Sequence, residues 1–544
     1  MTGTADPRLR VVICWHLHQP QYRDLAAGTV LRPWVYLHAL RDYVDLAMRL
    51  ESCPEAAAVV AFSPVLLEQL DDYCGELARH LQGGAPLGDP VLALLAAGGV
   101  PADRREWPAL VRACLSAHRV LRVERHASYR QLADFAMRLL EHDALAYASP
   151  QLMTDLAAWF HLAWCGEGLR EGDPRARDLV EQGRDFTPAQ LRSLLECIAD
   201  ALSGVVPRFR RLAGNGQIEL AVSPWGHPIL PLMLGFSAAR ETAPGLALPD
   251  DVAYPGGEDR ARWHLARAVQ VFTRSFGLRP RGCWPPEGAL SDRVVALMPA
   301  FGFDWVASGE SVLERSLPDA GAPGDGDPWH RAYAVGSAGT TCFFRDDELS
   351  DRVGFTYGRW DAAGAADDLV ARLERIAATA GPDAVVPVML DGDNVFEYYP
   401  GNGQEFVAAL YARLAAHPAL RLTTFSQCLV EGIESRPLPR LVAGSWIRGS
   451  LASWIGNPGR NRAWASLCEA KRMYDQVMVE GNLDERAEQA AEQLLGICEG
   501  SDWFWRFDED EDPGTLDPLF RRHLLNLYAA LGEAPPSPLT DVAG

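Results

Sequence analysis

Short apolar runs that end in polar residues recur along the chain, and longer amphipathic stretches separate most of them. Strands that are apolar on both faces and alternate with helices are typical of a parallel sheet, open or closed into a barrel. We therefore expect an α/β fold whose polar run ends meet at the carboxyl edge of the sheet, where barrel enzymes gather their functional groups. The runs lie at 11–20, 56–64, 218–227, 282–287, 303–311, 340–350, 384–394 and 420–427.

Two stretches break this alternation and predict helices without strands. Residues from about 71 to 212 have helical periodicity, which predicts a helical insertion or lid within a catalytic domain of residues 1–430. From 431 to 544 the pattern is again helical, with helices expected near 460–478, 484–499 and 515–532. We expect this C-terminal helical domain to pack on the barrel and to contribute to its active-site cleft.

Composition narrows the class of protein. The 51 Lys and Arg residues face 72 Asp and Glu residues, a net charge of -21, which disfavours nucleic acid or an anionic membrane surface as a partner. The first ten residues lack the apolar stretch of a signal peptide, and no run approaches the roughly 20 apolar residues of a membrane span. The 11 cysteines are odd in number and form no CxxC pair, which favours reduced thiols. A cytoplasmic location is predicted.

The first apolar run ends in the sequence HLHQP. His16 and His18 are one residue apart on a predicted strand, so they point to the same face, and Gln19 follows at once. Side chains of these types bind a metal ion, bind a ligand rich in hydroxyl groups, or lie at a solvated strand end. The spacing alone leaves all three interpretations open.

Carboxylates end two other runs. Glu287 follows two prolines, and Asp391 and Asp393 flank Gly392. Taken singly, Glu287 is equally typical of a helix or turn cap, and the aspartates of an acidic turn. Taken together, two carboxylates at strand ends are the minimum equipment for glycoside hydrolysis, in which one attacks the anomeric carbon or activates water and the other protonates the leaving oxygen.

These segments resemble, in order, the five separated motifs of glycoside hydrolase family 57, the α-glucan enzymes with an incomplete (β/α)7 barrel. The resemblance spans about residues 11–530. The segment FFRDDELSDRVGF at 343–355 is also typical of the branch that contains amylopullulanases and related α-amylases. The five counterparts are HQP at 18–20, GQIELAVSPWGHPILPLM at 216–233, CWPPEGALS at 283–291, LDGDN at 390–394 and GSWIRGSLASWIGNPGRNRAW at 444–464.

The resemblance implies a role for each residue. It makes Glu287 the nucleophile and Asp391 the general acid/base of a retaining enzyme. Asp393 stands where the family commonly has Glu, a shorter side chain of the same charge. The residues implied to line the glucose subsite are His16, His18, Gln19 and His227.

Further residues are candidates for substrate contact. Tryptophan rings offer flat apolar faces to sugars, although each of these rings is equally typical of a core position. Arg345 and Asp346 end another run and are candidates for binding hydroxyl groups or orienting Asp391, with a structural salt bridge as the alternative. The candidate rings are Trp225, Trp284, Trp446 and Trp454.

The sequence thus predicts a retaining glycoside hydrolase that acts without a cofactor or metal on α-1,4 and possibly α-1,6 bonds of α-glucans such as starch, glycogen and maltooligosaccharides. One alternative is a transferase or branching enzyme of the same family. A zinc-dependent enzyme resembling polysaccharide deacetylases or α-mannosidases would use His16, His18, His227 and Asp391 as ligands. Such enzymes place an aspartate near the first strand, whereas here the nearest, Asp24, lies outside the motif. A non-catalytic glucan-binding protein would not need both carboxylates.

Overall fold

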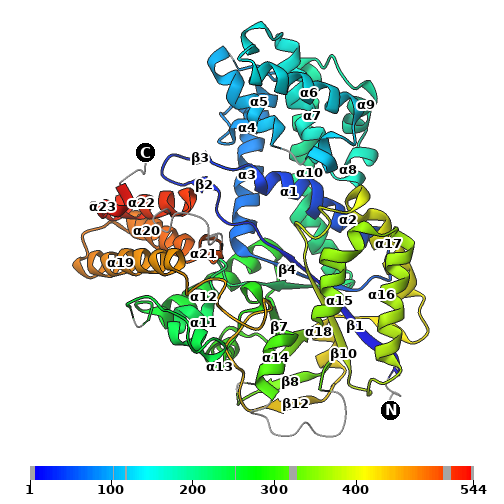
Figure 1. Ribbon diagram of the computed structural model, residues 1–544, viewed down its shortest axis with the longest axis vertical. Coiled ribbons are helices and arrows are strands. Elements are labelled where there is room, and N and C mark those ends of the chain that lie inside the picture. The colour runs from blue at the N-terminus through cyan, green and yellow to red at the C-terminus, as the bar shows by residue number, and fades with distance from the viewer. Residues whose placement is uncertain are drawn as a thin grey trace.

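The computed structural model describes residues 6–101, 103–116, 119–251, 253–317, 328–337, 339–505 and 516–540. Seven parallel strands form its curled central sheet (Figure 1). The backbone N–H of Asp346, just beyond the last of these strands, donates to the carbonyl of Pro387 in the first at 2.9 Å, so the two edges of the series meet. This confirms the incomplete (β/α)7 barrel. The strand order is β10 (Val385–Asp391), β1 (Leu9–Leu17), β4 (Ala58–Phe62), β5 (Ile218–Val222), β6 (Gly282–Cys283), β7 (Trp305–Gly309) and β9 (Thr341–Arg345).

Among the described residues, three shorter strands extend this sheet, and two more form a separate hairpin. Each of the eight predicted apolar runs contains a strand, because buried strands leave a continuous apolar pattern. The strands that the pattern did not predict have two to four residues, too few for a period to be read. The additional strands are β8 (Ala332–Val335), antiparallel to β9; β12 (Ser435–Leu438), parallel to β8; β11 (Leu420–Leu422), beside β1; and the hairpin β2 (Arg23–Asp24) with β3 (Thr29–Val30).

Helices fill the long connection between β4 and β5, where the sequence predicts an insertion. They form the upper lobe in Figure 1. α1 (Trp34–His38), η1 (Ala39–Tyr43) and α2 (Val44–Ser52) precede β4. The helices of the connection are α3 (Pro64–Gly83), α4 (Pro90–Ala96), η2 (Arg104–Glu106), α5 (Trp107–Leu115), η3 (Arg119–Val123), α6 (Ala127–Glu141), η4 (Leu145–Tyr147), α7 (Pro150–Trp164), α8 (Glu167–Gly172), α9 (Pro174–Gln182) and α10 (Pro188–Gly214).

The remaining helices of the barrel alternate with its later strands. They are α11 (Leu230–Leu234), η5 (Phe236–Glu241), α12 (Gly257–Phe276), η6 (Pro286–Gly288), α13 (Asp292–Leu297), η7 (Met298–Phe301), α14 (Glu310–Ser316), α15 (Asp347–Asp351), η9 (Arg352–Thr356), η10 (Tyr357–Arg359), α16 (Ala362–Ala377), η11 (Pro400–Gly403), α17 (Gln404–Ala415) and α18 (Phe425–Val430).

A C-terminal group of helices packs on one flank of the barrel, at the left of Figure 1. Its first, second and fourth helices lie where the sequence predicts helices. The group consists of α19 (Pro458–Glu480), α20 (Glu485–Cys498), α21 (Asp502–Trp505), α22 (Pro518–Leu531) and α23 (Ser537–Thr540).

Glu499, directly after α20, anchors this group to α12. It is 1% exposed and accepts hydrogen bonds from Arg260 at 2.8 Å and from Tyr254 at 2.7 Å, with His264 also at 2.8 Å. Burial opposes ionisation, but the charge of Arg260 and the hydrogen bonds outweigh it and lower the pKa of Glu499 to about 2. Since a buried charge without its partner is strongly destabilising, this network fixes the position of the end of α20.

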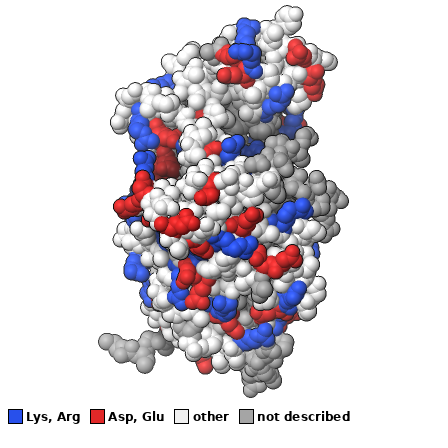
Figure 2. All heavy atoms as spheres, turned by 90° about the vertical axis from the view of Figure 1, so that its left-hand side faces the viewer, with Lys and Arg blue, Asp and Glu red and all other residues white. Residues whose placement is uncertain are grey.

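The surface and the cysteines bear on the predicted partners. On the face shown in Figure 2, acidic and basic side chains intermingle, and no broad basic patch is visible among the described residues. Within the described ranges, no helix has the length and apolar character that crossing a bilayer requires. All eleven cysteines are free thiols.

Candidate active site

Two cavities meet at the carboxyl ends of the barrel strands. The first, which we call the histidine cavity, has a volume of about 430 Å³, and the second, the aromatic cavity, about 740 Å³. Glu287, Asp391, Asn394 and Ile447 line both, so the two predicted catalytic carboxylates lie at the junction. The other residues of the histidine cavity are His16, His18, Gln19, Pro20, Tyr22, His227, Asp393, Ser453, Trp454, Arg460, Asp502 and Trp505.

The backbone holds Glu287 in an unusual conformation. Its φ is +57°, in the left-handed region that costs free energy for any residue with a Cβ. Trp446 holds this turn at two points. Its backbone N–H donates to the carbonyl of Glu287 at 3.0 Å, and its indole Nε1 donates to Oε2 of the same residue at 2.9 Å. A strained residue held at both backbone and side chain is typical of a site where orientation matters.

The environment of Glu287 disfavours its ionisation. Burial raises the pKa of Glu287 to about 8, and the negative charge of Asp391 contributes further in the same direction. The hydrogen bond from Trp446 acts in the opposite direction because it stabilises the carboxylate. The two carboxyl groups are therefore electrostatically linked, as a pair that handles one proton must be.

Three imidazole rings lie against one another beside this pair. The centroids of the His18 and His227 rings are 3.7 Å apart with planes inclined by 10°, and His16 lies 5.2 Å from His227. Burial lowers the pKa of His16, and it lowers that of His227 well below its usual value. These two rings are consequently neutral near pH 7 and offer both a donor and an acceptor.

Hydrogen bonds define the tautomer of His16. The hydroxyl of Ser223 donates to the carbonyl of Trp284 at 2.7 Å, so it must accept from Nε2–H of His16 at 2.9 Å. Nδ1 of His16 is then unprotonated, and it lies 3.6 Å from Oδ1 of Asp391. A proton acceptor therefore faces the predicted general acid.

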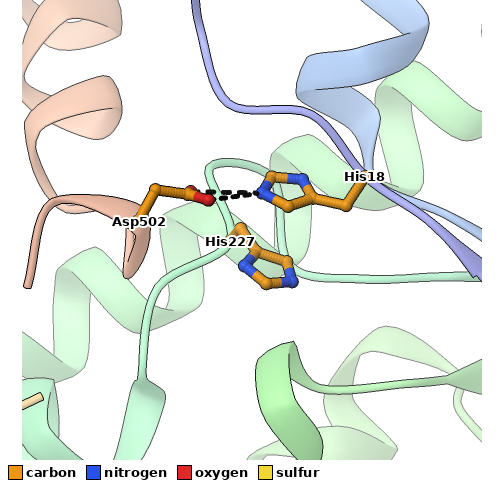
Figure 3. Close-up of side chains that lie close together, drawn as sticks. All are labelled: His18, His227 and Asp502. Atoms are coloured by element: carbon orange, nitrogen blue, oxygen red, sulfur yellow. Dashed lines mark hydrogen bonds and ion pairs between the residues drawn. The ribbon is translucent and has the colours of Figure 1, made fainter. Parts of the chain in front are cut away.

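His18 is held by protein groups at both ring nitrogens. Nδ1 lies 2.8 Å from the hydroxyl of Ser63. Nε2 lies 3.1 Å from the carboxylate of Asp502 (Figure 3). A carboxylate only accepts, so Nε2 of His18 carries a proton and donates to Asp502. The hydrogen-bonding capacity of His18 is thus used within the protein, and Asp502 is the group that adds free acceptor sites to the cavity.

His227 is held by the segment between α20 and α21. Its φ is +61°, the hydroxyl of Ser501 lies 2.9 Å from its Nδ1, and the N–H of Ser501 donates to its carbonyl at 2.9 Å. Its buried Nε2 has no partner among the described residues. Since an unpaired buried nitrogen is costly, this atom is suited to a hydroxyl group of a ligand.

Ser501 and Asp502 were not singled out from the sequence. Asp502 lies 484 residues after His18 in the chain. A Ser or Asp directly after a helix belongs to no periodic pattern that would indicate a contact with the first strand. Only the packing of α21 against the barrel brings them to the site.

The histidine cavity also contains a possible metal-binding group. His18, His227 and Asp502 each offer one ligand atom, and these atoms lie within 4.8 Å of one another. However, the lone pairs of imidazole nitrogens lie in the ring plane, and two rings stacked nearly parallel direct them side by side instead of at one point. Together with the occupied nitrogens of His18, this geometry fits a metal ion poorly and fits a hydrogen-bonding site well.

Gln19 and Asp393 pair at the floor of the cavity. The amide of Gln19 donates to Oδ2 of Asp393, and the hydroxyl of Tyr22 donates to Oε1 of Gln19 at 3.0 Å. Burial and the charge of Asp391 raise the pKa of Asp393 well above its usual value. Arg41 donates to the carbonyl of Asp393 at 2.8 Å, which fixes the turn that follows Asp391.

Two predicted sugar-stacking rings lie elsewhere. Trp225 and Trp284 are each 1% exposed and line neither cavity, so a sugar has no access to their faces. Trp225 donates to Glu68 at 2.7 Å, and Trp284 packs against Trp446. Trp225 and Trp284 are therefore core residues, as the alternative interpretation predicts, and their predicted contact with substrate is corrected.

Three other candidates, Trp446, Trp454 and Arg345, each line one of the two cavities. Trp446 lines the aromatic cavity, and Trp454 contributes to the histidine cavity although it is only 1% exposed. Arg345 lines the aromatic cavity, forms salt bridges with Asp347 and Asp351 and donates to the carbonyl of Met389, so it has the salt bridges of the alternative interpretation while its contact with substrate stays a prediction.

Asp346 does not line either cavity. Its carboxylate caps α15 by accepting from the N–H of Leu349 at 2.8 Å, and its other oxygen lies 2.9 Å from His330. Asp346 therefore caps α15, and the predicted contact of Asp346 with substrate is corrected.

Comparison with known proteins identifies the family. Residues 12–436 match the profile of Glycosyl hydrolase family 57. The chain belongs to this family. It is accordingly an enzyme that acts on glycosidic bonds, and the resemblance to the family is confirmed, with the first four motif counterparts inside the matched residues. No curated protein matches the chain.

Solved structures that the chain resembles share its fold. A GH57-type branching enzyme from Pyrococcus horikoshii is 16% identical, with 97% of this chain and 87% of that chain covered, at a TM-score of 0.56. A GH57 branching enzyme from Thermococcus kodakaraensis in complex with glucose is 15% identical, covering 96% and 90%, at 0.58. An α-amylase from Thermotoga maritima is 15% identical, covering 98% and 96%, at 0.55. At these identities the likeness establishes the fold, and the activities are of two kinds, branching enzyme for the first two structures and α-amylase for the third.

Proposed function

We propose that this protein is a retaining enzyme that cleaves α-glucans, with Glu287 as nucleophile and Asp391 as general acid/base. The observation that carries the proposal is the position of these two carboxyl groups at the junction of two cavities, one of which is lined by three histidines. A polymer of glucose crossing the junction would place one of its bonds between them. The neutral rings and amides of the histidine cavity suit the hydroxyl groups of a glucose unit.

The mechanism needs one carboxylate and one carboxylic acid. Glu287, with a pKa of about 8, retains a proton at neutral pH in the free enzyme. The reaction requires this proton on Asp391, whose Oδ1 lies 3.6 Å from the unprotonated Nδ1 of His16. The indole of Trp446 stabilises the ionised Glu287 that then attacks the anomeric carbon while Asp391 protonates the departing oxygen. Asp391 afterwards removes a proton from water or from an acceptor sugar, and the bond to Glu287 breaks.

The proposed substrate is an α-1,4-linked glucan such as starch, glycogen or a maltooligosaccharide, with α-1,6 bonds as a further possibility. Transfer to an acceptor glucan is the second candidate function. The aromatic cavity favours it, because this cavity offers room for an acceptor on the far side of the carboxylates.

We further propose that residues 431–544 complete the cleft as a helical domain. Ile447, Trp454, Arg460 and Asp502 come from this part of the chain and line the histidine cavity. Its motif-like stretch at 444–464 contains Trp446, the partner of Glu287.

One set of assays tests the proposal. Purified protein is incubated with amylose, pullulan and glycogen, and the products are resolved by chain length to separate hydrolysis from transfer. Glu287→Gln should lose several orders of magnitude in turnover, and azide should partly rescue Glu287→Ala by attacking the anomeric carbon from the side of the missing carboxylate, which gives a β-glycosyl azide. Near-normal turnover of Glu287→Gln would refute the assignment.

A further inference from the structure

Two aromatic rings at the aromatic cavity are turned toward solvent. Phe355 is 81% exposed and Tyr398 is 64% exposed, and both line the cavity that contains Glu287 and Asp391. Large aromatic side chains are usually well buried, and apolar groups exposed around a groove often mark a ligand-binding surface. The exposure of these rings therefore requires an explanation other than packing.

The rings are held on two segments that are fastened together. Phe355 lies in η9, and Tyr398 lies in the turn region that follows β10. Next to Tyr398, the buried Tyr399 donates its hydroxyl to the carbonyl of Val353 at 2.6 Å. This bond joins η9 to the segment that carries Asp391. The two rings thus have a defined position relative to the general acid.

The charges of the aromatic cavity fit an uncharged ligand. Apart from the two catalytic carboxyl groups, its lining includes the basic residues Arg345 and Arg448 and the acidic residues Asp351 and Glu397, which balance one another. Polar groups of both signs beside exposed rings are the combination that a sugar requires, since glucose has hydroxyl groups at its edge and apolar C–H faces.

The position of the carboxylates assigns this cavity to one side of the reacting bond. The histidine cavity encloses polar side chains that suit the glucose whose anomeric carbon reacts. The bond to be cleaved then crosses the junction at Glu287 and Asp391. The sugar on the other side of that bond must lie in the aromatic cavity.

We infer that Phe355 and Tyr398 form an aromatic platform, which binds the leaving part of the glucan and then the acceptor sugar. This inference rests on the proposed function. When a sugar acceptor lies on the platform, its hydroxyl oxygen bonds to the anomeric carbon as the bond to Glu287 breaks, and its proton passes to Asp391. The platform therefore determines how well an acceptor sugar competes with water.

The test compares two substrates that differ in their need for the platform. In α-maltotriosyl fluoride the leaving group is fluoride, so only the histidine cavity is occupied, whereas maltoheptaose occupies both cavities. We expect Phe355→Ala and Tyr398→Ala each to lower kcat/KM for maltoheptaose about tenfold, while fluoride release stays at the wild-type rate. With maltotetraose added as acceptor, the share of transfer product should fall as well.

Matched variants separate stacking from general damage. Tyr398→Phe keeps the ring, so its loss of kcat/KM for maltoheptaose should be much smaller than that of Tyr398→Ala. Tyr147→Ala removes a ring that is 90% exposed on the helical insertion, away from both cavities, and should change neither substrate. Melting temperatures establish that each variant is folded.

Two results would overturn the platform: unchanged maltoheptaose turnover in both alanine variants, or equal losses with maltoheptaose and with the fluoride. Failure of the proposed function has a different signature. In that case the wild-type protein would release no fluoride and cleave no glucan, and Glu287→Gln would be indistinguishable from it, so both the function and the platform would be rejected.

Discussion

The carboxylate of Asp502 accepts a hydrogen bond from Nε2 of His18 at 3.1 Å, although 484 residues separate the two in the chain. This contact keeps a proton on Nε2 of His18, because the carboxylate cannot donate. It also keeps the ring parallel to that of His227, whose position Ser501 fixes from the same segment.

Replacing Asp502 should therefore reduce activity. Asp502→Ala leaves Nε2–H of His18 without a partner and removes acceptor atoms from the histidine cavity, so we expect kcat/KM for a maltooligosaccharide to fall about tenfold or more. Reducing-sugar assays measure this loss. Glu485→Gln, at an exposed carboxylate in the first turn of α20, is the control and should keep wild-type kinetics. Full activity in Asp502→Ala would show that the orientation of His18 does not depend on this contact.

The stability of the protein should depend on pH through Glu287. Its folded-state pKa of about 8 exceeds the usual value of 4.5, so ionising it costs the folded state more than the unfolded state. Relative to Glu287→Gln, the wild type should lose up to about 1.4 kcal/mol of unfolding free energy per pH unit between pH 5 and 8. Above the folded-state pKa of about 8 the loss should level off.

Urea unfolding of both proteins at pH 5, 6, 7 and 8 measures this difference, with these pH values spanning the interval between the two pKa values at about one-unit steps. Glu405→Gln, at an exposed carboxylate in the first turn of α17, serves as the control and should show no such trend. A constant difference between the wild type and Glu287→Gln over this range would contradict the raised pKa of Glu287.

Trp454 should contribute mainly to stability. It is 1% exposed, and its carbonyl accepts from the indole of Trp464 at 2.9 Å. Trp454→Ala should therefore cost roughly 3–5 kcal/mol of unfolding free energy, as large core truncations do. Chemical denaturation measures this cost. Trp360→Ala, at a ring that is 44% exposed, should cost much less. If Trp454→Ala unfolds like the wild type but has lost its turnover, the ring serves the substrate instead of the core.

Activity should survive removal of metal ions. The nucleophile and the acid are both carboxyl groups, and the stacked rings of His18 and His227 do not direct their lone pairs at one point. Exhaustive dialysis against EDTA should leave turnover at its initial value, and elemental analysis of the dialysed protein checks that metal has been removed. Loss of turnover that Zn²⁺ restores would instead establish the zinc alternative, with His18, His227 and Asp502 as ligands.

The sequence predicted the parts of the fold that repeat a pattern. Apolar runs identified the buried strands, and polar residues at their ends placed His16, Glu287 and Asp391 at one edge of the sheet. Helical periodicity located α19, α20 and α22 within a few residues. Such features follow from local spacing, which a single sequence contains.

The remaining features depend on tertiary contacts that no local spacing encodes. The sequence could not distinguish a cleft tryptophan from a core tryptophan, so Trp225 and Trp284 were predicted at the substrate and lie in the core. Nor could it show that Asp502 faces His18. Phe355 is exposed, but the amino-acid pattern around it does not indicate which side chains of that segment face solvent.

The dependence of His227 on Ser501 and of His18 on Asp502 has a consequence for the order in which the protein becomes functional during translation. The ribosome makes Glu287 and Asp391 well before it makes these two residues, so a nascent chain contains both carboxyl groups before its two imidazole rings are held in position. A partial chain that ends within α20 would lack both contacts altogether. Catalytic competence would then arise late, once synthesis has passed residue 502, and an incomplete translation product would be inactive.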